Sequence, residues 1–197
     1  MDNLIKEMEN YAEEKNIPIM QKKGIDFLCK IIDKSEVKSI LEIGTAIGYS
    51  AIKMALVSDD ITVTSIERDQ ERYIMALNNI KKAKLDKRID LIYADALDVD
   101  IDHKYDLIFI DAAKGQYIKF FNKFKNNLND NGIIISDNLS FHGLVEQKER
   151  IESRNLRQLV NKIRKYVDFL NDNKEFKTKF YKVGDGIAIS IKEDKNE

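Results

Sequence analysis

The chain has 197 residues, of which 34% are charged, and a net charge of -1 at pH 7. That length suits a single domain over residues 1–197, and the near-neutral charge excludes nucleic-acid binding by overall charge alone, so a local basic patch would be needed. One cysteine excludes an internal disulfide, no apolar run is long enough to span a membrane, and without a signal peptide the composition predicts a cytoplasmic protein.

Two amphipathic helices open the chain. Apolar residues at helical spacing predict a first helix over residues 2–14. The segment Asn16-Ile-Pro18 prevents it from continuing. A second helix is predicted from about Met20 to Asp33. Residues 1–36 are therefore expected to form an N-terminal helical cover, although the same apolar stripe could instead serve a subunit interface.

A strand and a glycine turn follow. The apolar run that ends at Ile43 predicts a buried strand, and Gly44 and Gly48 predict a tight loop before a helix over residues 48–57. Glycines in such a turn let the backbone approach a ligand closely, because they lack a Cβ atom. Glu67 lies about 20 residues beyond the loop, where an acid commonly holds a ribose hydroxyl.

Strands and helices alternate through the middle of the chain. This alternation predicts an α/β fold with a Rossmann-like, mostly parallel sheet and helices on both of its faces. Helices are predicted over residues 70–83 and 116–128, strands over 61–66, 89–93, 105–110 and 133–136, and a turn over 130–132.

The last third departs from this pattern. A helix is predicted over residues 153–171. Two β-rich runs, 175–183 and 186–192, flank the sequence Gly184-Asp-Gly186 and indicate a hairpin. We therefore expect seven strands, with an antiparallel C-terminal hairpin whose last strand is inserted into the sheet.

An acidic residue falls at or just beyond the carboxyl end of each of five predicted strands. These acids are Glu42, Glu67, Asp95, Asp111 and Asp137. Ligands of doubly wound sheets gather at that edge, around the point where strand order reverses. Helix capping and turn formation explain any one of these acids, but five at one edge favour a binding site.

Three oxygen donors are expected to converge. Asp111 and the pair Asp137-Asn138 follow strands that should be neighbours in the sheet. Carboxylate and amide oxygens suit Mg²⁺, whereas one cysteine and two isolated histidines do not suit zinc. Lys114 follows Asp111 by three residues and could take a proton from a hydroxyl beside that cation; the alternative is an ordinary solvated lysine.

Three ordered motifs resemble those of the metal-dependent class I O-methyltransferases, the catechol and caffeoyl-CoA O-methyltransferase group. They are Glu42-Ile-Gly-Thr-Ala-Ile-Gly-Tyr-Ser50, Asp111-Ala-Ala-Lys114-Gly-Gln-Tyr117 and Ser136-Asp-Asn138. The likeness extends over nearly the whole chain. Two further segments, Ile17–Met20 and Val183–Ser190, resemble the bacterial tRNA 5-hydroxyuridine methyltransferases more closely.

The resemblance implies a role for each motif residue. Mg²⁺ would be held by Asp111, Asp137 and Asn138, and Lys114 would be the catalytic base. Relatives are commonly homodimers, so a homodimer is expected. S-adenosylmethionine would be bound by Met20, Glu42, Gly44, Ser50, Glu67, Ala94, Asp95 and Asp111.

The implied reaction is methyl transfer from a sulfonium to a hydroxyl oxygen. The expected acceptor is 5-hydroxyuridine at the wobble position of tRNA, which would become 5-methoxyuridine. The alternative acceptor is a small catechol-like or other vicinal-oxygen substrate. A basic run over residues 148–165 could hold tRNA phosphates, although a solvated helix face explains such runs more often.

Two other classes of function stay open. Hydride transfer with a nicotinamide cofactor suits the fold, but the dinucleotide fingerprint Gly-x-Gly-x-x-Gly is missing, since Thr45 and Ala46 follow Gly44. A non-catalytic RNA-binding module is disfavoured, because clustered carboxylates repel phosphates unless a cation intervenes.

Overall fold

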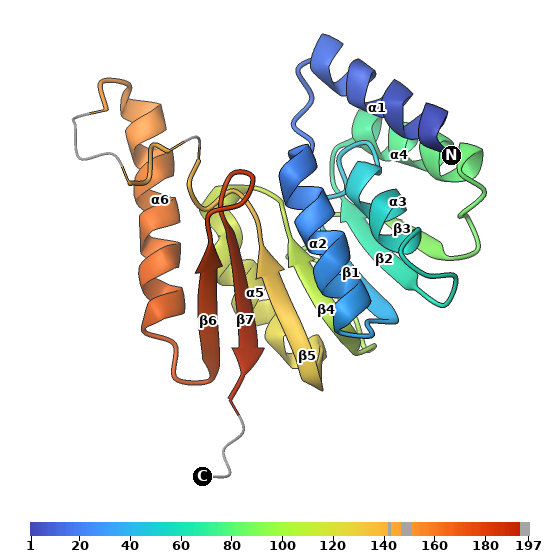
Figure 1. Ribbon diagram of the computed structural model, residues 1–197. Helices are drawn as coiled ribbons and strands as arrows, with labels where there is room; N and C mark the ends of the chain where they lie inside the picture. Colours follow the sequence, from blue (N-terminus) through green and yellow to red (C-terminus); the bar gives the residue numbers. More distant parts are fainter. Residues whose placement is uncertain (142, 147–150, 194–197) are drawn as a thin grey trace.

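A seven-stranded sheet forms the centre of the computed structural model, which describes residues 1–141, 143–146 and 151–193 (Figure 1). The strands are β1 (Ser39–Ile43), β2 (Thr62–Glu67), β3 (Ile89–Tyr93), β4 (Tyr105–Ile110), β5 (Leu128–Ser136), β6 (Phe176–Tyr181) and β7 (Ile187–Lys192). The helices are α1 (Asp2–Glu14), α2 (Lys22–Lys34), α3 (Tyr49–Ala55), α4 (Gln70–Lys82), α5 (Tyr117–Phe124) and α6 (Arg154–Asn171), with the short 3-10 helices η1 (Lys114–Gln116) and η2 (Lys125–Asn127).

Strand order reverses between β1 and β4, since the full order is β3-β2-β1-β4-β5-β7-β6. The chain enters at β1, builds β2 and β3 on one side, and returns to build β4 and β5 on the other. All pairs among these five strands are parallel. Their carboxyl ends therefore share one edge, where such sheets bind ligands. The predicted Rossmann-like α/β fold is confirmed.

The antiparallel insertion of the last strand is also confirmed. β7 lies between β5 and β6 and pairs antiparallel with both. Because β7 runs against β5, it begins beside the carboxyl end of β5, with Ala188 opposite Ser136. The turn between β6 and β7, at the upper edge in Figure 1, therefore lies at the same edge as the carboxyl ends of the parallel strands.

Alternation along the strands separates two apolar cores. Ile40 faces a core shared with α1, α2, α3 and α4, whereas Leu41 faces a core shared with α5 and α6. Met8 of α1 is buried, and Tyr49 of α3 donates a hydrogen bond to Glu9 of α1 at 2.7 Å. The apolar stripe of the first helix thus packs on its own chain. Within the residues described, no helix combines the length and apolar character that crossing a bilayer requires.

One predicted boundary is wrong. The helix predicted over residues 116–128 is instead divided among η1, α5 and η2, and Leu128 is already part of the sheet. The turn predicted over residues 130–132 lies within β5 as a bulge, because pairing with β4 steps from Leu128 to Ile133. Leu128 is buried, so its apolar character fits the end of a helix and the start of a strand equally well.

Candidate active site

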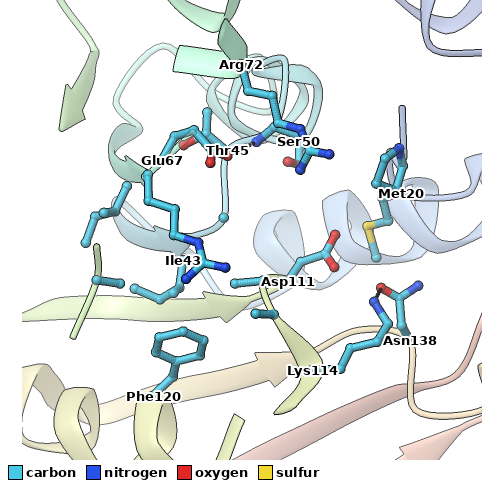
Figure 2. A pocket seen from close by; sticks show the side chains of 18 of the residues that line it. Met20, Ile43, Thr45, Ser50, Glu67, Arg72, Asp111, Lys114, Phe120 and Asn138 are labelled. Carbon is cyan, nitrogen blue, oxygen red and sulfur yellow. Dashed lines mark hydrogen bonds between the residues drawn. The ribbon is translucent and has the colours of Figure 1, made fainter. Parts of the chain in front are cut away.

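A cavity of about 480 Å³ opens at the edge where strand order reverses. Figure 2 shows Glu67 and Arg72 toward one end of it, and Asp111, Lys114 and Asn138 toward the other. Two predicted site residues do not line the cavity and are buried, Glu42 and Asp137. The predicted residues that do line it are Met20, Gly44, Ser50, Glu67, Ala94, Asp95, Asp111, Lys114 and Asn138.

Gly44 lets the glycine turn touch the segment after β4. Its φ is +99°, and a Cβ atom there would lie 2.3 Å from the carbonyl oxygen of Asp111, so a side chain does not fit. The Gly44 amide donates to the Ile66 carbonyl, and the Asp111 amide to the Ile43 carbonyl, each at 3.0 Å. The turn predicted to hold a cofactor is therefore in backbone contact with a predicted metal ligand.

Glu67, at the end of β2, stabilises the same turn. Its Oε2 accepts a hydrogen bond from the Ala46 amide, and its Oε1 accepts one from the Asp69 amide, both at 2.8 Å. The side chain is buried and borders the cavity. Because a carboxylate oxygen can accept more than one hydrogen bond, Glu67 keeps the capacity to bind a hydroxyl there.

Glu42 is placed differently from the prediction. It is fully buried in β1 and accepts hydrogen bonds from the hydroxyls of Ser50 and Ser65. Burial raises its pKa to about 7, against the opposing effect of those two hydrogen bonds. Only Ser50 of this group borders the cavity, so Glu42 influences the cavity through Ser50 and does not line it. Alternation puts Glu42 on the same face of β1 as Ile40, and Ser50 of α3 and Ser65 of β2 enclose it there.

Two cations in the cavity wall, Arg68 and Arg72, were missed by sequence reasoning. Arg68 Nη1 pairs with Asp95 Oδ2 at 3.1 Å, and the Leu97 amide donates to Asp95 Oδ1 at 2.9 Å. The Leu97 hydrogen bond, with a smaller contribution from Arg68, holds the pKa of Asp95 below its usual value despite some desolvation. The sequence could have indicated them, because both follow Glu67 within five residues and therefore lie near the carboxyl edge of the sheet.

Asp111 and Asp137 are brought together by the pairing of β4 with β5. Ile110 pairs with Ser136, so the residues that follow lie at the same level. Asp137 is 1% exposed, and its Oδ1 has no hydrogen-bond partner among the described residues. Burial, and then the charge of Asp111, raises the pKa of Asp137 to about 8; burial likewise raises the pKa of Asp111. A bound cation would stabilise both ionised forms.

Lys114 reaches this cluster from η1. Its Nζ donates a hydrogen bond to Asn138 Oδ1 at 2.8 Å and lies 5.8 Å from the centre of the Phe141 ring (Figure 2). Asn138 has a left-handed φ of +61°, which asparagine adopts more readily than most residues. The structure thus brings Asp111, Asn138 and Lys114 to one end of the cavity.

Asp185 is a cavity residue that sequence reasoning missed. It lies in the turn between β6 and β7, is 4% exposed, and accepts a hydrogen bond at Oδ2 from Asn138 Nδ2 at 3.3 Å. Its Gly-Asp-Gly context indicates a hairpin turn, and the resemblance of residues 183–190 gave Asp185 no role. The usable indication was the antiparallel insertion of the last strand, because that insertion carries the turn to the carboxyl edge of the sheet.

The donor atoms at this end of the cavity fit a hard divalent cation. Within the described residues, no three His, Cys, Asp or Glu side chains form a ready-made cage. The available set is the carboxylates of Asp111 and Asp137 with the amide oxygen of Asn138, and Asp137 Oδ1 is an unpartnered acceptor within the part of the chain described. Together with Asp185 there are three acidic groups against one amine, that of Lys114. Hard oxygen donors with surplus negative charge suit Mg²⁺.

Comparison with known proteins points to one family. The family model described as O-methyltransferase matches residues 1–193. The tapetum-specific methyltransferase 1 of Arabidopsis thaliana is 30% identical over 183 residues, which cover 89% of this chain and 77% of that protein. A caffeoyl-CoA O-methyltransferase of Populus kitakamiensis is 26% identical over 183 residues, covering 88% of this chain and 77% of that protein.

Solved structures share the fold over almost the whole chain. A candidate caffeoyl-CoA O-methyltransferase from Staphylococcus aureus is 39% identical, with a TM-score of 0.91 over 96% of this chain and 92% of that one. An O-methyltransferase from Bacillus cereus, solved in complex with SAH, is 24% identical, with a TM-score of 0.83 over 98% of this chain and 92% of that one. At the latter identity the likeness shows the fold alone.

Proposed function

The chain belongs to the O-methyltransferase family and is an enzyme of that kind, and from this premise we propose that it transfers the methyl group of S-adenosylmethionine, with Mg²⁺, to 5-hydroxyuridine in tRNA. The backbone contact between Gly44 and Asp111 carries the proposal. A cofactor on the glycine turn would lie directly beside an acceptor hydroxyl at the acidic end of the cavity.

The cavity suits S-adenosylmethionine. Its volume of about 480 Å³ lies within the range of roughly 300–1,000 Å³ that small-molecule sites occupy. Glu67 can accept from a ribose hydroxyl, while Ala94 and Asp95 border the part expected to hold the adenine. Met20 covers the opposite side, near the expected methyl donor. The Bacillus cereus protein, which shares this fold, was solved with SAH.

Lys114 is the proposed base. Its Nζ is held 2.8 Å from Asn138 Oδ1, at the end of the cavity where the acceptor hydroxyl would lie. Asp111, Asp137 and Asn138 would hold Mg²⁺, whose positive charge would lower the pKa of that hydroxyl. In its neutral form, Lys114 would take the hydroxyl proton on Nζ, a contribution of typically about 10²–10⁴-fold. The cavity walls would align oxygen, methyl and sulfur.

5-Hydroxyuridine suits this site because its 5-hydroxyl and 4-carbonyl oxygens sit on neighbouring carbons, as in a catechol. Positive charge on α6 supports a tRNA substrate. Arg154, Lys162 and Lys165 are exposed on that helix. Lys162 lies against η1, since a Cβ atom on Gly115 would lie 3.1 Å from its Nζ. These cations could hold backbone phosphates beside the site.

Other cations of the basic run have structural contacts. Arg157 Nη1 donates to the Ile151 carbonyl at 3.1 Å, and Arg164 Nε donates to the Val145 carbonyl at 3.0 Å. Both tie α6 to the segment that precedes it. Two further cations of the run lie outside the described residues, Lys148 and Arg150.

Mass spectrometry of tRNA nucleosides from a strain lacking the gene tests the substrate. Loss of 5-methoxyuridine with accumulation of 5-hydroxyuridine would support the tRNA proposal. Complementation with the wild-type gene should reverse the change, and complementation with Lys114→Ala should not. An unchanged nucleoside profile would favour the second candidate, a small vicinal-oxygen acceptor, which the names of the plant caffeoyl-CoA and flavonoid methyltransferases favour.

We further propose that the enzyme is a homodimer and acts in the cytoplasm, where tRNA is modified. The support is the resemblance to a group whose members are commonly homodimers. Analytical ultracentrifugation tests the assembly, because a species of 22.9 kDa at micromolar concentration would exclude a stable dimer.

A further inference from the structure

We infer that Asp185 is a positioning residue, which fixes the side-chain amide of Asn138 so that the amide oxygen stays directed at the cation site. The inference rests on the proposed function only in so far as Asn138 holds a cation. The observation behind it is that the side chain of Asn138 lies between a hydrogen-bond donor, Lys114, and an acceptor, Asp185.

The two partners of Asn138 favour one orientation of its amide. Lys114 Nζ donates to Oδ1 at 2.8 Å, and the carboxylate of Asp185 accepts from Nδ2 at 3.3 Å. A flipped amide would turn its NH₂ group toward the lysine amine and its oxygen toward a carboxylate, so both contacts would become unfavourable. Because Oδ1 has two lone pairs, it can accept from Lys114 and still bind a cation.

The turn that contains Asp185 is hydrogen-bonded to the residues that follow Asn138. The Leu139 amide donates to the Gly186 carbonyl at 3.0 Å, and the Ser140 amide donates to the Asp185 carbonyl at 2.8 Å. Gly186 has a φ of +87°, and a Cβ atom there would lie 2.6 Å from the Ser140 nitrogen. These contacts hold the backbone of Asp185 beside Asn138, within reach of its side-chain amide.

An unpartnered carboxylate oxygen indicates that the ligand of this site is a cation. Asp137 precedes Asn138 in the chain, is buried, and has an Oδ1 atom that accepts no hydrogen bond within the described residues. A buried carboxylate oxygen without a donor is a place for a cation. A hydrogen-bond partner that orients a metal ligand, as Asp185 would orient Asn138, raises metal affinity by about 10–100-fold in known sites.

Mn²⁺ binding, followed by the electron paramagnetic resonance signal of the free ion, tests this without an activity assay. Asp185→Ala should weaken Mn²⁺ binding by about 10–100-fold. Asp185→Asn removes the same charge but keeps an oxygen that can accept from Asn138, so it should retain more affinity than Asp185→Ala. Val183→Ala changes the same turn outside the cavity wall and, as a matched control, should bind Mn²⁺ like the wild type.

The outcomes separate this inference from the proposed function. Equal Mn²⁺ affinity in the wild type and Asp185→Ala would overturn the inference and leave the metal site standing. Equal losses in Asp185→Asn and Asp185→Ala would also overturn it, since charge alone would then explain the effect. No Mn²⁺ binding by the wild type would overturn the metal part of the proposed function, and this inference with it. Should Asp185→Ala fail to fold, Asp185→Leu takes its place, because leucine has a similar branched shape and offers no acceptor.

Discussion

At the scale of single residues, two neighbouring carboxyl groups at the acidic end of the cavity are desolvated together. Asp137 shows this most directly, because it is buried and its Oδ1 accepts no hydrogen bond among the described residues. The pKa values of Asp111 and Asp137 are both raised, chiefly by burial. A bound cation would lower both pKa values again, because a nearby opposite charge favours the ionised forms.

Removing the cation, or one of its ligands, should therefore stop the reaction. Treatment with EDTA and the substitution Asp137→Ala should each lower methyl transfer by roughly a hundredfold or more. Initial rates with an excess of S-adenosylmethionine measure both effects. Added Mg²⁺ should restore the EDTA-treated wild type but not the variant. Full activity in EDTA would show that no metal is needed.

Loss of the proposed base should affect chemistry and spare binding. Lys114→Ala should lower kcat by about 10²–10⁴-fold, because no other described amine reaches Asn138. Calorimetric titration should find unchanged affinity for S-adenosylmethionine. Lys119→Ala, an exposed lysine on α5, is the matched control. A kcat of wild-type size in Lys114→Ala would assign the proton transfer to another group.

Glu42 should make stability depend on pH. Its pKa is raised from 4.5 to about 7 by burial, so the folded protein keeps a proton that the unfolded chain releases. Stability should accordingly fall as pH rises from about 4.5 to 7, by about 3 kcal/mol from this group. Glu42→Gln should remove that loss, since glutamine stays neutral and can bond both Ser50 and Ser65.

Urea unfolding of the wild type and Glu42→Gln at pH 5 and pH 8 measures this effect. The variant should gain stability relative to the wild type at pH 8, and much less at pH 5. Glu71→Gln, at an exposed position on α4, should show no such dependence. A difference between wild type and Glu42→Gln that does not change with pH would rule out a neutral, buried Glu42.

At the scale of elements, α6 brings positive charge to the rim of the site. Its residue Lys162 lies against η1, which carries Lys114. Two of its cations, Arg157 and Arg164, donate hydrogen bonds to backbone carbonyls. These hydrogen bonds hold both guanidinium groups against the segment that precedes the helix. The described cations of the basic run thus divide into some that hold the helix to the preceding segment and others that face solvent.

Charge reversal on the solvent-facing part should weaken tRNA binding. Arg154→Glu with Lys162→Glu should lower affinity for unmodified tRNA and make the logarithmic salt dependence shallower by about one to two phosphate contacts. Filter binding at several salt concentrations measures both. Lys81→Glu with Lys82→Glu, both exposed on α4, is the control for the same change in net charge. Unchanged binding would leave α6 as an ordinary solvated helix.

At the scale of the whole molecule, strand order places the glycine turn and the acidic cluster side by side. The glycine turn follows β1, Asp111 follows its neighbour β4, and Asp137 follows β5, the next strand along the sheet. The order reverses at β1 and β4, which leaves a space above their carboxyl ends for a ligand. The inserted β7 completes this edge by carrying the Asp185 turn beside the end of β5.

Cofactor binding should raise the thermal stability of the whole fold. S-adenosylmethionine at a hundred times its Kd should add about 2.7 kcal/mol, which corresponds to a rise in Tm of about 5–10 °C for a chain of this size. Differential scanning calorimetry measures the shift, and NAD at the same concentration is the control. A shift with NAD and none with S-adenosylmethionine would favour hydride transfer instead.

Local pattern by itself determined the fold and most of the site. Strand and helix periods are properties of short segments, so the alternation of elements and the hairpin around Gly184 and Gly186 follow from them. Once a parallel sheet is expected, the carboxyl ends of its strands share an edge. The gathering of Glu67, Asp111 and Asn138 around one cavity follows from that geometry.

Only the tertiary structure decided which side chains face the cavity and which lie behind it. Glu42 is buried and does not line the cavity because Ser50 and Ser65 enclose it, and Asp185 borders the cavity because β7 is inserted beside β5. The bulge before Ile133 likewise depends on how β5 meets β4. Contacts between segments far apart in the chain set all three features, and a local period carries no information about such contacts.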